Sequence, residues 1–156
     1  MRLAIFFVAA FALLAQKYTG PVPEKEDILY LVQADNLIPT EATTAQEQKG
    51  KKGETVYYVS GAASSARTPL ASPIFLLKVK DLVPEKLELY KLEVRNGRRE
   101  ITIRTGKNAK NQPPVRVDSK RLDEGLYRLE VGESLPKGQY SFTPEGSNDV
   151  FCFEVY

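Results

Sequence analysis

Short runs in which apolar and polar side chains alternate recur along most of the chain. A period of two places every second side chain on the same face, which is typical of a β-strand with one buried face. The runs predict strands over 28–32, 55–59, 73–79, 89–95, 98–104, 115–117, 126–131, 139–142 and 150–155, with a short edge pairing over 37–39. Because no long stretch has the 3.6-residue apolar period of an amphipathic helix, the pattern favours an all-β protein.

Two tight turns support this interpretation. Asn96-Gly97 separates two alternating runs, and a type I′ hairpin turn needs positive φ at both central residues, which Asn and Gly tolerate. Further along, Pro136 fixes φ and Gly138 permits an unusual φ, so the chain turns sharply before Tyr140. A tyrosine entering a late strand in this way resembles the tyrosine corner of immunoglobulin-like sandwiches, in which the hydroxyl returns to nearby backbone.

Together these elements predict an all-β domain over 28–156, an immunoglobulin-like or related Greek-key β-sandwich of about 8 to 10 short strands. Alternation assigns to its interior Leu29, Leu31, Val56, Phe75, Leu77, Leu92, Val94, Ile101, Ile103, Leu129, Tyr140, Phe142, Phe151 and Phe153. The same alternation directs Glu93, Glu100 and Glu130 toward solvent. A slip of one residue would invert any of these strands.

Polar stretches between the runs predict loops. Residues 40–53 predict a mobile loop or hairpin tip with a helical turn or two, and 118–125 predict a turn with some helical character. Residues 61–69 are mostly small and predict a further loop, and residues 82–86 predict a turn or one helical turn.

The N-terminus has the composition of an export signal. Arg2 precedes an apolar run that ends at Ala15, which is shorter than a bilayer span and suits the core of a signal peptide. We therefore expect a signal peptide over 1–15, an extended lead-in over 16–27, and a secreted or periplasmic protein, with no stable membrane span once the signal is removed. A retained anchor or a buried N-terminal helix is the alternative.

Charge and composition exclude several classes of protein. The chain has 22 basic and 20 acidic residues, so loss of Arg2 leaves a net charge near +1, which argues against nucleic acid as a partner. It has no histidine, which excludes histidine-based triads and histidine metal ligands. Cys152 is the single cysteine and lies in an aromatic strand, so we expect a buried, inert thiol. No phosphate-binding glycine motif occurs, and we expect no cofactor, no metal site and no catalytic residue.

The candidate contacts for a partner are basic and aromatic. Arg95, Arg98 and Arg99 cluster at the predicted hairpin tip, where they could contact an acidic partner or simply keep a strand edge soluble. Tyr57 and Tyr58 are adjacent, so one of them points outward from a regular strand and could stack on a sugar.

Several of these runs resemble a loose group of uncharacterised secreted bacterial proteins. The resemblance lies in Tyr57–Ala63, Leu89–Val94, Gly125–Leu129, the Gly138-Gln139-Tyr140 corner and Val150–Phe153, although Glu154 stands where members of the group often have glycine. It implies an exported β-domain and no particular activity.

The sequence therefore favours an exported, non-catalytic β-sandwich module that binds an unknown protein or glycan or has a structural role. Two alternatives stay open. One is a carboxylate-based glycan hydrolase, which needs two acidic side chains facing each other across a cleft. The other is a subunit that assembles by β-strand addition through its C-terminal strand.

Overall fold

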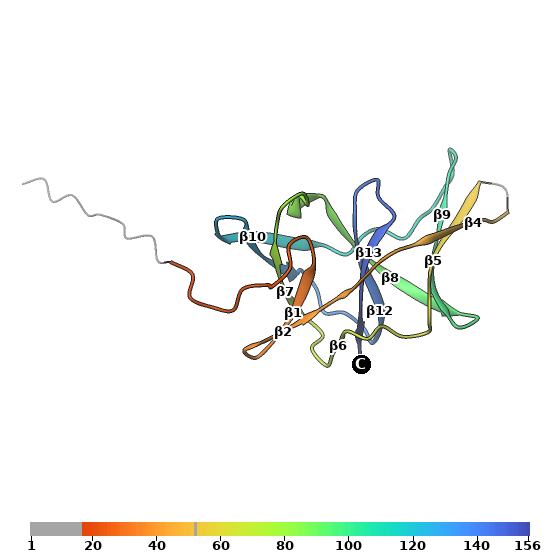
Figure 1. The fold of residues 1–156 in the computed structure, drawn as a ribbon. Helices are drawn as coiled ribbons and strands as arrows, with labels where there is room; N and C mark the ends of the chain where they lie inside the picture. The colour runs from red at the N-terminus through yellow and green to blue at the C-terminus, as the bar shows by residue number, and fades with distance from the viewer. Residues whose placement is uncertain (1–16, 52) are drawn as a thin grey trace, which may run out of the picture.

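The chain forms two antiparallel β-sheets that pack against each other, in a computed structural model that describes residues 17–51 and 53–156 (Figure 1). The predicted all-β class and sandwich of two sheets are confirmed, whereas immunoglobulin-like or Greek-key connectivity stays a prediction. The predicted signal peptide over 1–15 lies outside the described residues. Within the part of the chain that is described, no helix has the length and apolar character needed to cross a membrane.

The smaller sheet has five strands in the order β10-β11-β7-β1-β2 and lies on the left in Figure 1. Its strands are β1 (Leu29–Gln33), β2 (Asn36–Pro39), β7 (Ile74–Lys78), β10 (Val117–Asp123) and β11 (Leu126–Val131). A 3-10 turn, η1 (Pro84–Lys86), follows β7 where the sequence predicts a turn.

The larger sheet has eight strands. They run in the order β3-β13-β12-β8-β9-β5-β4, with β6 paired in parallel to β13. Its strands are β3 (Glu41–Thr44), β4 (Gln46–Lys49), β5 (Glu54–Ser60), β6 (Arg67–Thr68), β8 (Leu87–Arg95), β9 (Arg98–Arg104), β12 (Gly138–Pro144) and β13 (Asp149–Val155). The described residues thus form 13 strands, more than the sequence predicts.

The two ends of the larger sheet are neighbours along the chain. β3 pairs with β13 and β4 pairs with β5, while Ala45 alone separates β3 from β4. The segment 41–49 therefore joins the first strand of the sheet to the last, and the sheet closes on itself. In Figure 1 this segment crosses β13 and continues as β4 beside β5. We call the space that the closed sheet encloses the lumen.

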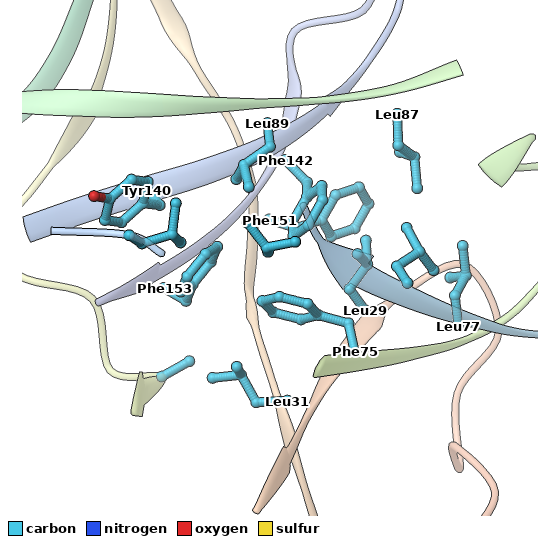
Figure 2. Packing of buried hydrophobic residues seen from close by; sticks show 14 of the residues in the cluster. Leu29, Leu31, Phe75, Leu77, Leu87, Leu89, Tyr140, Phe142, Phe151 and Phe153 are labelled. Carbon is cyan, nitrogen blue, oxygen red and sulfur yellow. The ribbon is translucent and has the colours of Figure 1, made fainter. Parts of the chain in front are cut away.

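Aromatic side chains fill the space between the two sheets. The ring of Phe75 in β7 meets those of Phe142 and Phe153 edge-on, with centroids 4.9 Å apart in both pairs. Tyr140 stacks on Phe153 at 5.5 Å, and Figure 2 shows these side chains converging from β7, β12 and β13. Their burial confirms the predicted interior for Leu29, Leu31, Phe75, Leu77, Leu129, Tyr140, Phe142, Phe151 and Phe153. We call this cluster the inter-sheet core.

Both predicted turns are confirmed. Asn96 and Gly97 have φ values of 51° and 73°, as a type I′ turn requires. The Tyr140 hydroxyl donates a hydrogen bond to the carbonyl oxygen of Pro136 at 2.6 Å, so the tyrosine holds the corner that precedes its own strand.

Two predicted loops are strands instead. Residues 41–49 form β3 and β4, and residues 117–123 form β10 at the edge of the smaller sheet. Both segments are polar because most of their side chains face solvent, so they lack the apolar alternation that predicts a strand. Pairing with partners far away in the sequence decides their conformation.

Three predicted side-chain environments are wrong. Tyr57 lines the lumen, and successive side chains of a strand point to opposite faces. Val56 therefore lies on the outer face of the closed sheet. Val94 is 50% exposed, because β8 continues beyond the point where β12 pairs with it. Glu100 is 8% exposed instead of facing solvent freely, since Arg98 donates a hydrogen bond to it at 2.6 Å and covers it.

Candidate functional site

The sequence predicts buried side chains but does not distinguish the inter-sheet core from the lumen. Some of these buried side chains line the lumen. Ala45, Val59, Leu92, Val150 and Cys152 form one buried cluster, and Tyr57 and Ile101 pack against it. β5 and β13 are four places apart along the sheet, which is about 19 Å in a flat sheet. Their side chains share a cluster because the sheet curves and closes around them.

Part of the lumen beside this cluster is hollow and forms a cavity of about 450 Å³. The cavity wall is apolar over much of its area, and its apolar and aromatic side chains are Ala45, Tyr57, Tyr90, Leu92, Ile101, Ile103, Pro144 and Val150. Its polar side chains are Glu47, Glu88, Ser141, Thr143, Ser147 and Asn148. A largely apolar hollow of this size with a few polar groups is typical of a site for a small organic molecule.

One end of the cavity opens to solvent. The turn between β12 and β13 contributes Gly146 and Ser147 to its rim, and both Gly146 and Glu47 are exposed. We call this end the mouth. A ligand could therefore enter at the mouth without separating any pair of strands.

Two carboxylates lie at the mouth. Glu88 accepts a hydrogen bond from the Tyr90 hydroxyl at 3.0 Å through Oε2. Glu47 accepts one from the side-chain amide of Asn148 at 3.0 Å through Oε1. Burial, followed by the hydrogen bond to Glu88 and its charge, raises the pKa of Tyr90 to about 12. Burial and the nearby charge of Glu47 raise the pKa of Tyr57 as well.

Arg99 closes the opposite end of the lumen. Its side chain is 1% exposed and forms two hydrogen bonds with the Glu41 carboxylate, at 2.7 and 2.9 Å. It also donates to the carbonyl oxygens of Ser60 and Gly61, each at 2.9 Å. The hydrogen bonds from Arg99 are the largest cause of the lowered pKa of Glu41. Because the buried charge is paired and hydrogen-bonded, it forms a stable plug instead of a reactive centre.

The small-residue loop after β5 covers this plug. Ser64 is 3% exposed; its hydroxyl donates a hydrogen bond to the carbonyl oxygen of Cys152 at 3.0 Å and accepts one from the backbone N–H of Ala66 at 3.3 Å. Its backbone N–H donates to the side chain of Gln139, also at 3.0 Å. Cys152 itself is fully buried, and burial raises the pKa of its thiol to about 11, so the expectation of a buried thiol is confirmed.

The predicted contact residues do not lie together. Arg95 and Arg98 remain on the outer face of the hairpin, where Arg95 pairs with Glu93 and Arg98 lies over the ring of Tyr58 at 4.2 Å. Arg99 is enclosed, so its prediction as a surface contact is corrected: alternation along β9 directs it into the lumen. Tyr57 lines the cavity, and its neighbour Tyr58 is the outward one.

The sequence alone does not pair the two mouth carboxylates. Glu47 lies in a segment predicted as a loop, and Glu88 is one of several acidic residues that could serve a carboxylate-based hydrolase, with no neighbour that distinguishes it. One signal was available: residues 40–49 contain neither glycine nor proline, so nothing in them breaks a strand. Across the described residues, no group of three or more His, Cys, Asp or Glu side chains is placed to hold a metal ion.

Comparisons with family models, with curated proteins and with solved structures found no match to this chain. The resemblance to secreted bacterial β-proteins therefore stays a prediction. The geometry defines a two-sheet β-protein whose closed sheet encloses a cavity.

Proposed function

We propose that this protein is an exported, non-catalytic binding module that holds a small organic molecule in the lumen of its closed sheet. The observation that carries the proposal is the cavity of about 450 Å³, with a largely apolar wall and a few polar groups. Export is supported by the composition of residues 1–15. A lumen ligand replaces the protein or glycan surface contact that the sequence alone favours.

A fluorescence titration tests this proposal. The neutral dye N-phenyl-1-naphthylamine fluoresces strongly in apolar surroundings, so its emission should rise when it enters the lumen. Ile101→Trp fills the cavity and should abolish the rise. Thr102→Trp, the next residue on the same strand, alters the opposite face and is the matched control, because Thr102 does not line the cavity.

Circular dichroism and urea unfolding establish that both variants are folded. Equal dye binding by the wild type and by a folded Ile101→Trp variant would refute a lumen site. Loss of binding in both variants would point to a general surface effect and would also refute it.

A carboxylate-based hydrolase is the second candidate, because Glu47 and Glu88 line the same cavity. Hydrolysis requires one acid that carries a proton and one that does not. Glu88 is hydrogen-bonded to Tyr90 and Glu47 to Asn148, and neither contact gives the two carboxylates the different roles of acid and base, so the hydrolase has less support. Release of nitrophenol from a panel of nitrophenyl glycosides, lost in Glu88→Gln, would reverse this preference.

Assembly through the C-terminal strand has less support. β13 pairs with β12 along one edge and with β3 and β6 along the other, so both of its edges are occupied. Strand addition to a partner would require those pairs to separate.

A further inference from the structure

The charged side chains of the lumen are distributed unevenly between its two ends. Within the described lining of the cavity, the charged side chains are Glu47 and Glu88, and neither lysine nor arginine contributes. Arg99 is the buried basic residue at the closed end of the lumen, and it is paired with Glu41. The cavity therefore presents a net negative charge to a ligand at its mouth.

Both mouth carboxylates keep capacity for a ligand. The hydrogen bonds from Tyr90 and Asn148 engage one oxygen of each carboxylate, Oε2 of Glu88 and Oε1 of Glu47. A carboxylate accepts several hydrogen bonds, so each has positions left for a donor or a positive charge. Tyr90 and Asn148 also limit the movement of the two carboxylates, which lowers the entropy lost when a ligand is bound.

Two aromatic rings accompany these carboxylates. Tyr57 and Tyr90 both line the cavity, and both have a carboxylate beside them. Both phenols are neutral at physiological pH, because their pKa values lie above the ordinary value of 10, so the rings add no charge of their own. The face of a neutral aromatic ring attracts a cation, most strongly where water is excluded.

We propose that the ligand of the lumen is an organic ammonium ion with an apolar body, bound with its nitrogen at the mouth between Glu47 and Glu88. The apolar body lies against Leu92, Ile101 and Val150 deeper in the lumen. This inference rests on the proposed function, since it specifies the chemistry of the molecule that the lumen holds. It favours an organic cation over a metal ion because most of the wall is hydrocarbon.

Competition against the neutral dye separates this inference from the proposed function. The competitors are 3-phenylpropyltrimethylammonium, its neutral analogue with carbon in place of nitrogen, and the anion 4-phenylbutyrate. In the wild type at low salt, the cation should displace the dye at about a tenfold lower concentration than the neutral analogue. The anion should be the weakest of the three, and added salt should reduce the advantage of the cation.

Replacement of both carboxylates tests the residues. In the double variant Glu47→Gln, Glu88→Gln, the advantage of the cation should disappear while the dye still binds. Glu130→Gln is the control, because Glu130 pairs with Arg128 on the smaller sheet, away from the mouth, and its change should leave the advantage intact.

Each outcome has a distinct meaning. If the dye enters the lumen but the cation and the neutral analogue compete equally, the ammonium inference fails and the lumen site survives. If the cation keeps its advantage in the double variant, the residue assignment is wrong. If Ile101→Trp does not affect the dye, the proposed function fails first.

Discussion

The inter-sheet core and the lumen share strands but differ in how completely they are filled. Along β13, Phe151 and Phe153 point into the inter-sheet core, whereas Val150 and Cys152 point into the lumen. β8 divides in the same way, since Leu89 belongs to the core and Leu92 to the lumen. Along β13 the core face carries large aromatic rings, and the lumen face carries the smaller side chains of Val150 and Cys152 beside a hollow.

This difference separates stability from binding. Aromatic side chains bury large areas and interlock, so the inter-sheet core supplies much of the hydrophobic stabilisation. The side chains on the closed wall, Tyr57 and Tyr90 included, do not fill the lumen, and the space they leave is available to a ligand. The strands are thus held rigid from one side while the other side forms a preformed site.

The largest expected effect compares two residues of β13. Phe153→Ala should lower the free energy of unfolding by about 3–5 kcal/mol, because it leaves a cavity among Phe75, Tyr140 and Phe142. Val150→Ala, on the wall of an existing cavity, should cost about 1 kcal/mol. Urea unfolding of both variants measures the difference. Equal losses would contradict the distinction between a filled core and a hollow lumen.

Next in size is the plug at the closed end. Arg99→Met should lower the free energy of unfolding by about 2–4 kcal/mol, because Glu41 loses its partner in a partly buried site. Arg104→Met, on the same strand, breaks an exposed pair with Glu54 and should cost about 0–1 kcal/mol. Similar values for the two, again from urea unfolding, would show that the burial of Arg99 has no energetic consequence.

Acid should weaken the plug before it affects the inter-sheet core. The pKa of Glu41 is lowered in the folded protein, chiefly by hydrogen bonds from Arg99. Its contribution is therefore complete above the ordinary value of 4.5 and is lost as the pH falls through the lower, folded value. Urea unfolding at pH 5.5 and at pH 3 should show a steeper loss for the wild type than for Glu41→Gln. Parallel losses would contradict this linkage.

The smallest expected loss of stability comes from removing a tyrosine hydroxyl, either from Tyr140 in the inter-sheet core or from Tyr57 in the lumen. Tyr140→Phe keeps the ring in the core but removes the hydrogen bond to Pro136, so it should cost about 0.5–1.5 kcal/mol. Tyr57→Phe removes a hydroxyl that lies beside the exposed Glu47 and should cost less. Thermal or urea unfolding ranks the two variants, and a larger loss for Tyr57→Phe would reverse the comparison.

Strands with one apolar face were predictable from the sequence. The runs containing Phe75, Phe142 and Phe153 were placed correctly because their alternation reflects burial against another sheet. The Asn96-Gly97 turn and the Tyr140 corner were also predictable, since each depends on local backbone chemistry. The strands over 41–49 were not, because neither of their faces is apolar and their partners lie far along the chain.

The candidate site was predictable only in part. Tyr57 was singled out by its neighbour Tyr58, but as a surface residue and not as a wall of the lumen. Arg99 was grouped with Arg95 and Arg98 by position, although alternation puts it on the opposite face of the strand. Glu47 and Glu88 are 41 positions apart by their numbers, and nothing local relates them.

By itself, the sequence determined the class of fold, the two turns and the aromatic set that binds the sheets together. These features follow from the period of the side chains and from local backbone preferences, which act over a few residues. Only the tertiary structure decided that the larger sheet closes, that it encloses a hollow and that Glu47 and Glu88 line the same cavity. Closure depends on β3 and β4 pairing with β13 and β5, and such long-range pairing leaves no periodic signal in a polar segment.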